Sequence, residues 1–251
     1  MVTGAPDELA SGASYTEPRL AALYDAFNPW EAYHDFYLAL AGAGPIRVLD
    51  MGCGTGRLAA ALAARGHQVS AADPARAMLD VARHLPGGGK VTWIESDAAG
   101  LSVAARFDLI IMTGHAFQTL LRDEDVLGAL KSLKRHLAPH GRLAFETRNA
   151  AVAEWQEWLP DQTRERRPID GIGMVELHYD IRAVEGPLVT FETHFRFADG
   201  ATVAASTLRF MHQPEVAAFL AEAGFENVTW HGDWEKSAFR SDSPEIIAIA
   251  A

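Results

Sequence analysis

The chain has 251 residues, of which 49% are hydrophobic and 22% are charged, and its formal net charge is −11. This composition is typical of one globular α/β domain with an insertion or a small cap. The negative charge argues against a general nucleic-acid or anionic-membrane binder, because phosphate binding requires clustered Lys and Arg. Cys53 is the single cysteine, so we expect no disulfide and no metal cluster.

No charged-then-apolar leader precedes the first helix, and no apolar run is long enough to span a bilayer. We therefore expect a cytoplasmic protein without membrane contacts. Leucines and aromatic residues recur at helical spacing over residues 18–40, with a break near Asn28-Pro29. Two helices that pack on a sheet explain most of these residues.

A glycine-rich loop follows the first predicted strand. An apolar run at 46–49 ends at the carboxylate of Asp50, three glycines alternate at Gly52, Gly54 and Gly56, and an amphipathic helix begins at Leu58. Glycine allows a ligand to lie against the backbone where a Cβ would interfere, and the free N–H groups of the helix start favour anionic groups. This strand–loop–helix unit predicts a nucleotide-like ligand.

The spacing of these glycines distinguishes between ligands. A dinucleotide site requires G-x-G-x-x-G, but Arg57 occupies the place of its third glycine, which argues against a nicotinamide dehydrogenase. The run V-L-D-M-G-C-G-T-G at residues 48–56 instead resembles motif I of the class I S-adenosylmethionine-dependent methyltransferases. The alternative is a generic glycine-rich turn of another α/β fold.

This resemblance implies a doubly wound, Rossmann-like sheet of seven strands in the order 3-2-1-4-5-7-6. It implies S-adenosylmethionine as cofactor, S-adenosylhomocysteine as product, and an Asp50 that orders the glycine loop and the methionine end of the cofactor. N-terminal helices in this family close over the cofactor, and Tyr15 and Tyr24 are our candidates for that role. Further expected cofactor contacts are Gly52, Cys53, Gly54, Gly56, Pro74 and Thr113.

Asp73 ends the second predicted strand, at 67–72, about 20 residues beyond the glycines. A carboxylate at this position can accept hydrogen bonds from both ribose hydroxyls. Asp73 could also cap the next helix, with Pro74 as its first residue, and the two roles can coexist, but its position favours the ribose role. Met78 would then pack on the adenine or in the core.

The third predicted strand, at 91–94, is followed by Asp97 and Ala98. The family places an acidic residue here near the adenine amino group, and the next backbone N–H near a ring nitrogen. Taken alone, Asp97 would be a turn residue.

The loop after the fourth predicted strand, at 107–112, is where donor and acceptor should meet. It lacks the Asp/Asn-Pro-Pro-aromatic run of enzymes that methylate nucleic-acid bases. His115 is the group in this loop that can take a proton near neutral pH, and it is our candidate catalytic base. A neutral histidine in the pocket wall is the alternative.

A helix at 123–137 and a turn at 138–141 lead into the fifth predicted strand, at 142–146. Glu146 and Arg148 at its end either face substrate or form a solvated salt bridge. Three runs then alternate with period two, at 175–184, 188–197 and 202–212, and predict an inserted three-stranded antiparallel sheet. Candidates for its inward-facing polar residues are His178, His194, Arg196, Arg209 and His212.

The insert resembles that of bacterial sugar N-methyltransferases, where it serves as a lid or a homodimer surface. A helix at 214–223 and strands at 227–231 and 245–250 complete the sheet. We thus expect a helical cap (1–40), a cofactor-binding core (41–150 and 214–251) and a β insertion (151–213). The expected function is methyl transfer to an N or O atom of a small molecule by in-line displacement. The alternative is a cofactor-binding fold repurposed as a lyase, cyclase or partner-binding subunit.

Overall fold

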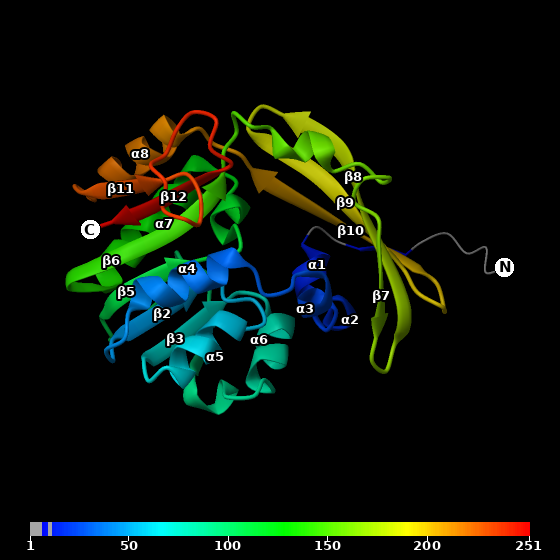
Figure 1. Cartoon of the computed structure of the whole chain (residues 1–251), viewed down its shortest axis with the longest axis horizontal. Coiled ribbons are helices and arrows are strands. Elements are labelled where there is room, and N and C mark those ends of the chain that lie inside the picture. Colours follow the sequence, from blue (N-terminus) through cyan, green and yellow to red (C-terminus); the bar gives the residue numbers. More distant parts are fainter. Residues whose placement is uncertain (1–6, 10–11) are drawn as a thin grey trace.

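The computed structural model describes residues 7–9 and 12–251, which form two β-sheets and the helices around them (Figure 1). The larger sheet has seven strands in the order β11-β12-β6-β5-β2-β3-β4. Five of them are parallel, and β12 and β11 close the sheet in antiparallel pairing. This arrangement confirms the predicted order. The strands are β2 (Arg47–Met51), β3 (Gln68–Asp73), β4 (Thr92–Glu95), β5 (Phe107–Met112), β6 (Leu137–Arg148), β11 (Val228–His231) and β12 (Glu245–Ala250).

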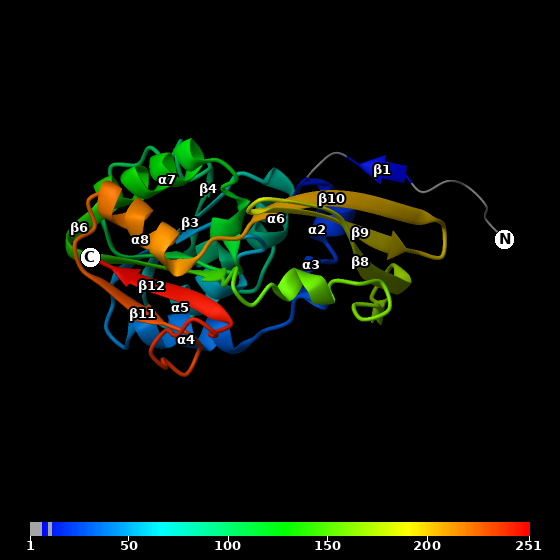
Figure 2. The same cartoon turned by 90° about the horizontal axis from the view of Figure 1, so that it is seen from above.

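Helices cover both faces of this sheet (Figure 2). On one face, α4 (Ala32–Ala41) and α5 (Arg57–Ala64) pack on apolar side chains that include Val48 and Leu109. On the other face, α7 (Asp123–His136) and α8 (Gln213–Glu222) pack on side chains that include Ile110 and Phe145. Because the central strands are buried on both faces, their sequences are continuous apolar runs rather than alternating ones. The remaining core helix is α6 (Arg76–Arg83).

The predicted turn at 138–141 is wrong in one respect, because these residues lie within β6. The pairing of β6 with β5 shifts between Phe107, which pairs with Leu137, and Leu109, which pairs with Arg142. The extra residues form a bulge with His140 at a φ of 65°. A Cβ on Gly141 would lie 2.6 Å from the carbonyl oxygen of Phe107, so the close approach of the two strands requires glycine.

The inserted sheet has five strands, not the three predicted. Its order is β1-β10-β9-β8-β7, and the three predicted runs form β8, β9 and β10. The additional strands are β7, which pairs antiparallel with β8, and β1, which pairs parallel with β10. The bounds are β1 (Asp7–Leu9), β7 (Glu165–Ile169), β8 (Gly173–Glu185), β9 (Leu188–Arg196) and β10 (Ala201–Arg209).

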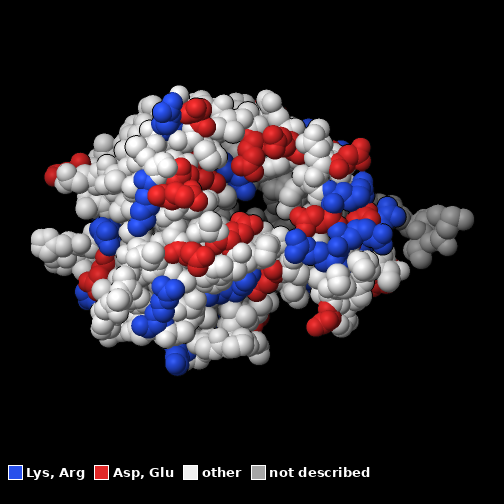
Figure 3. All heavy atoms as spheres, in the orientation of Figure 1, with Lys and Arg blue, Asp and Glu red and all other residues white. Residues whose placement is uncertain are grey.

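Period-two alternation gives this insert sheet two different faces. Its outer face is polar, and arginines gather over β7 and β8 (Figure 3). These arginines are ion-paired, for example Arg164 with Glu176 and Arg182 with Glu192, each at 2.6 Å. The inner face is mostly apolar and turns toward the core sheet.

Three short helices lie between the two sheets (Figure 1). They are α1 (Ala13–Thr16), α2 (Pro18–Ala21) and α3 (Tyr24–Phe27), and the chain then breaks near Asn28-Pro29, as predicted, before α4. Leu20 and Leu23 pack on the insert sheet, whereas Ala21 packs on α6. Within the described residues, no helix has the length and apolar character needed to cross a membrane.

Candidate active site

A cavity of about 620 Å³ lies between the carboxyl ends of the core strands, the helices α1–α3 and the inner face of the insert sheet. Its mouth contributes to the hollow between the two lobes in Figure 3. This volume is in the range of small-molecule sites. Because parallel strands end at the same edge of a sheet, side chains far apart in sequence line one cavity here.

The glycine loop forms the floor of this cavity, and its three glycines are needed for different reasons. All three have positive φ, at 73° for Gly52, 53° for Gly54 and 77° for Gly56. A Cβ on Gly52 would lie 2.8 Å from the Cβ of Ala116, and one on Gly56 would lie 2.4 Å from the ring of Trp93. Only a Cβ on Gly54 would meet open space. The expected close approach of a ligand therefore explains Gly54, whereas protein packing explains the other two.

Asp73 lies at the end of β3 and lines the cavity. Its Oδ2 accepts a hydrogen bond from the Gly54 N–H at 2.8 Å, and its Oδ1 accepts one from the Ala75 N–H at 2.8 Å. The helix α6 is capped by Ala75, not by Asp73, so the expected capping alternative is wrong. Burial raises the pKa of the Asp73 carboxyl, and the two backbone N–H groups oppose that effect.

Asp50 is the last but one residue of β2, just before the glycine loop, and is 1% exposed. Its Oδ1 has no hydrogen-bond partner among the residues that the structure describes. Asp50 borders a second space of about 50 Å³, which shares Tyr24, Gly54 and Thr113 with the large cavity. A buried carboxylate oxygen without a partner is costly, so this position fits a hydrogen-bond donor supplied by a ligand.

The N-terminal segment closes over the glycine loop. Thr55 donates a hydrogen bond to Asp25 at 2.6 Å, and Arg57 donates one to the carbonyl oxygen of Asn28 at 3.0 Å. Tyr15 and Tyr24 both line the cavity, with ring centroids 6.2 Å apart. Burial raises the pKa of both phenols, so both stay protonated.

The remaining predicted cofactor contacts lie in two groups. Pro74, Met78, Asp97, Ala98 and Thr113 line the large cavity, and Cys53 lines only the smaller space. Met78 also belongs to a small apolar cluster with Ala75 and Ala77, so it lines the cavity and packs in the core. Asp97 accepts a hydrogen bond from the Gly100 N–H at 2.6 Å, which is the expected turn, while it also borders the cavity.

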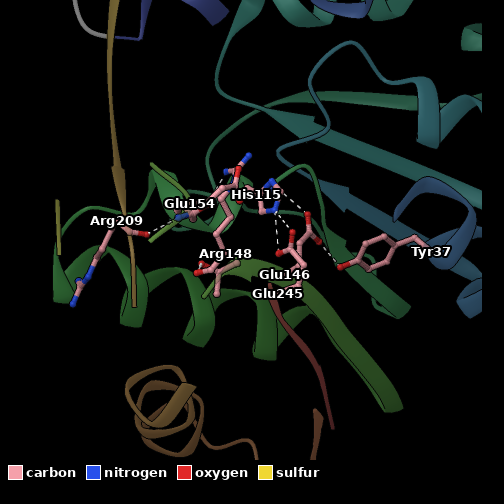
Figure 4. A network of polar contacts seen from close by, with 9 residues as sticks. Tyr37, His115, Glu146, Arg148, Glu154, Arg209 and Glu245 are labelled. Atoms are coloured by element: carbon pink, nitrogen blue, oxygen red, sulfur yellow. Dashed lines mark hydrogen bonds and ion pairs between the residues drawn. The ribbon is translucent and has the colours of Figure 1, made fainter. Parts of the chain in front are cut away.

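His115 lies in the cavity wall in a left-handed conformation, with a φ of 59°. This conformation costs a residue with a side chain about 1–2 kcal/mol. Its backbone N–H donates to Glu146 Oε1 at 2.8 Å, and the other oxygen of Glu146 accepts from the Tyr37 hydroxyl (Figure 4). Glu146 is fully buried, so this carboxylate fixes the backbone of the loop from below.

The His115 imidazole is paired with Glu245 at the start of β12 (Figure 4). Its Nε2 lies 3.0 and 3.1 Å from the two carboxylate oxygens. Burial lowers the pKa of His115 to about 4, and the Arg148 charge adds to this effect. Burial raises the pKa of Glu245 to about 8. The pair therefore holds a single proton at neutral pH, and the imidazole carries no net charge.

The half of the cavity under the insert sheet is mainly aromatic and aliphatic. It also contains Arg148, at the end of β6, whose Nε donates to Glu154 at 3.1 Å and whose Nη1 donates to Gln118 at 3.0 Å. The two alternatives for Arg148 thus coexist, because it forms a salt bridge and lines the cavity. The other lining residues here include Trp158, Leu177, Tyr179, Phe191, Thr193, Phe195, Ser206 and Leu208.

The polar candidates expected from the insert do not line the cavity. His178 and His194 lie opposite each other on the outer face, with ring centroids 4.7 Å apart. Arg209 is buried but donates to Asp123 at 2.6 Å, away from the cavity. The alternation of side chains explains this outcome, since the inward positions are occupied by Leu177, Tyr179 and their neighbours.

Sequence reasoning did not identify Tyr37, Glu154, Trp158 or Glu245. Glu245 had a usable signal, because one carboxylate opens an otherwise apolar strand, and such a buried charge requires a partner. Trp158 and Glu154 lie in an irregular segment with no periodic pattern. No signal in the sequence pointed from Tyr37 to Glu146.

Residues 48–141 match a family model described as a methyltransferase domain. The cypemycin N-terminal methyltransferase of a Streptomyces species is 29% identical over 210 residues, which cover 80% of this chain and 81% of that protein. This chain is an S-adenosylmethionine-dependent methyltransferase. The chain is also 33% identical over 111 residues to a ubiquinone biosynthesis O-methyltransferase of Vibrio cholerae, covering 43% of this methyltransferase and 44% of that protein.

The structural likeness includes the insert. The sugar N-methyltransferase KedS8 from a Streptoalloteichus species superimposes with a TM-score of 0.71 at 17% identity, covering 99% of this methyltransferase and 98% of that chain. At this identity the likeness concerns the fold. S-adenosylmethionine is the cofactor of the family, and two features here fit it: the open space above Gly54 and the unpartnered oxygen of Asp50.

The glycine loop gives a first prediction. Gly66→Ala is the reference, because Gly66 has a φ of 93° and open space around it, so alanine there adds backbone strain alone. Gly56→Ala should lower the free energy of unfolding by about 1–3 kcal/mol more than the reference, because its Cβ overlaps Trp93. Gly54→Ala should match the reference in urea unfolding but bind S-adenosylhomocysteine more weakly in calorimetry. Equal cofactor affinity in Gly54→Ala and Gly66→Ala would contradict a ligand lying on Gly54.

The buried carboxyls give a second prediction, on pH. Burial raises the pKa of Asp50 to about 7 and that of Glu245 to about 8, so the folded protein keeps protons that the unfolded chain releases near pH 4. Stability should therefore fall as pH rises, by about 2 kcal/mol between about pH 6.5 and 9. Urea unfolding of the cofactor-free protein measures this slope. The variant carrying both Asp50→Asn and Glu245→Gln should show a clearly flatter slope, and an unchanged slope would contradict the assignment.

Proposed function

We propose that this enzyme transfers the methyl group of S-adenosylmethionine to an amine nitrogen of a small molecule held under the insert sheet. The main support is the extent of the similarities. The relative named for an N-terminal acceptor matches 80% of the chain, and the sugar N-methyltransferase structure covers the insert as well. The relative named for O-methylation matches only 43% of the chain. The two proteins whose similarity extends over the insert, and so over the half of the cavity beneath it, are thus both named for methylation of nitrogen.

The cofactor would occupy the part of the cavity nearest the core strands. Asp73 would accept hydrogen bonds from the ribose hydroxyls, since each of its oxygens accepts one backbone hydrogen bond and retains a lone pair. Asp97 and Ala98 would face the adenine, with Met78 packed against it. Asp50 and Tyr24 would lie at the methionine end, beside the smaller space.

S-adenosylmethionine supplies a methyl group that its sulfonium already activates. The residues of this chain hold the acceptor in line and exclude water, and such positioning can supply roughly 7–11 kcal/mol of the barrier. The acceptor nitrogen forms a bond to the methyl carbon as the carbon–sulfur bond breaks, and the nitrogen then releases a proton. When Glu245 is ionised and accepts a hydrogen bond from Nε2–H, His115 would receive this proton at Nδ1, which makes no hydrogen bond within the described part of the chain. Glu245 would hold Nε2 and balance the imidazolium charge.

The decisive experiment for this function uses purified enzyme, methyl-deuterated S-adenosylmethionine and a panel of small amines with matched alcohols. We expect S-adenosylhomocysteine in equal amount to an amine that gains the labelled methyl group, detected by mass spectrometry. Labelled alcohols without labelled amines would overturn the nitrogen assignment. Cofactor consumption without any methylated product would overturn methyl transfer itself.

The same assay tests the roles of His115 and Glu245. His115→Ala should lower kcat by about 10²–10⁴-fold, the usual range for general-base catalysis, without changing S-adenosylhomocysteine affinity. Glu245→Gln should lower kcat less, because its amide still bonds Nε2 but cannot balance the imidazolium charge. Unchanged turnover in His115→Ala would leave the imidazole as a wall residue only.

Asp73 gives a prediction on cofactor affinity. Asp73→Ala should weaken S-adenosylhomocysteine binding by about tenfold or more, because charge-assisted hydrogen bonds contribute roughly 1.5–3 kcal/mol each. The matched control is Asp108→Ala, which removes an exposed carboxylate paired with Arg47 at the amino end of β5. Calorimetry should show full affinity in the control. Full affinity in Asp73→Ala as well would refute the ribose role.

A further inference from the structure

Arg148 is the one Lys or Arg among the described residues that line the large cavity. Its guanidinium is held in place from three sides. Nε donates to Glu154, Nη1 donates to Gln118, and the guanidinium carbon lies 5.3 Å from the centre of the Trp158 ring. Gln118 is itself fixed by donating to the carbonyl oxygen of Arg209 at 3.1 Å. The position of the cation is therefore set before a substrate arrives.

One nitrogen of this guanidinium, Nη2, keeps both of its N–H donors available. Nη2 makes no hydrogen bond with any residue that the structure describes, although the other two nitrogens each make one. The side chain is 20% exposed and borders the cavity. A guanidinium N–H that faces a ligand site binds oxygen acceptors, and most strongly those with a fixed planar geometry.

Arg148 also lies close to the proposed site of chemistry. Its charge acts on His115 and Glu245, and also on Tyr15 of α1 and Tyr179 of β8. The guanidinium thus lies where the loop that carries His115, the N-terminal helices and the insert sheet meet. A substrate oxygen bound to Nη2 and a substrate nitrogen facing His115 would therefore be only a few bonds apart in the substrate.

The charge balance around Arg148 selects between oxygen acceptors. Glu154 already neutralises the guanidinium, with both its carboxylate oxygens at 3.1 Å from Nε. A ligand carboxylate at this position would be repelled by the nearby Glu154 carboxylate, and no unpaired cation would offset that repulsion. A neutral carbonyl oxygen meets no such repulsion. The aromatic wall of Trp158, Tyr179 and Phe191 further fits an apolar side group.

We propose that the methyl acceptor is an α-amino amide, the unit that also begins a peptide, with its carbonyl oxygen on Arg148 and its apolar side group under the insert sheet. This inference rests on the proposed amine methylation and names its substrate class. Arg148 is then a residue that determines specificity rather than one that takes part in the bond changes. A free amino acid and a simple amine would each lack part of this match.

The test measures binding to the enzyme saturated with S-adenosylhomocysteine, so it does not depend on turnover. Three probes are compared by calorimetry: L-phenylalanine amide, L-phenylalanine and 2-phenylethylamine. The amide should bind about tenfold more tightly than the amine, since its carbonyl oxygen adds a hydrogen bond to a charged group. It should also bind more tightly than the amino acid. Tighter binding of the amino acid, equal binding of all three, or no binding would each overturn the proposal.

Variants separate recognition from a structural role. Arg148→Gln should remove the advantage of the amide over 2-phenylethylamine, and Arg148→Lys should keep only part of it, because a lysine ammonium lacks the planar fork. Arg47→Gln is the matched control, since it breaks an ion pair with Asp108 at the opposite end of the strands. An equal loss of affinity for both probes in Arg148→Gln would mean that Arg148 only supports the fold. Methylation of amines without preference for the amide would contradict this inference while leaving the proposed function intact.

Discussion

The structure depends on one carboxylate that joins three elements. Asp73 ends β3, accepts a hydrogen bond from the glycine loop at Gly54 and accepts another from the start of α6 at Ala75. The three glycines of the loop have no side chains to hold their left-handed conformations, so neighbouring groups must impose its shape. Asp73 supplies that restraint on one side, and the contacts of Thr55 and Arg57 with the N-terminal segment supply it on the other. The floor of the cavity is thereby organised before a cofactor binds.

A second buried carboxylate, Glu146, restrains the loop that carries His115. Glu146 accepts hydrogen bonds from the His115 N–H and from the Tyr37 hydroxyl, and it fixes a histidine backbone that would otherwise avoid a φ of 59°. The imidazole then meets Glu245 from the neighbouring strand β12. Both arrangements bury charge at the carboxyl end of the sheet. The stability lost through this burial is tolerated because the same groups define the position of the site.

The core could be predicted from sequence because its signals are local. Apolar runs, the glycine loop and Asp73 follow one another within a few residues, and right-handed crossovers leave few alternative orders for the strands. The seven-stranded order was confirmed for that reason. The insert was predicted only in part. Strand β7 contains Pro168 and three charged residues, so it carries no apolar alternation, and β1 joins the sheet from a distant part of the chain.

The site shows the same division between local and long-range information. Asp73, Asp97 and His115 could be placed by their position after a strand, whereas Glu245 meets His115 across 130 residues. The choice of inward-facing residues in the insert failed because the period of two identifies two faces without saying which one is covered. That choice is made by the apolar residues, since Leu20 and Leu23 of the N-terminal segment pack against Leu177 and Phe195. The polar histidines are thereby turned outward, and Arg148, delivered by the core strand β6, remains the cation of an otherwise aromatic acceptor pocket.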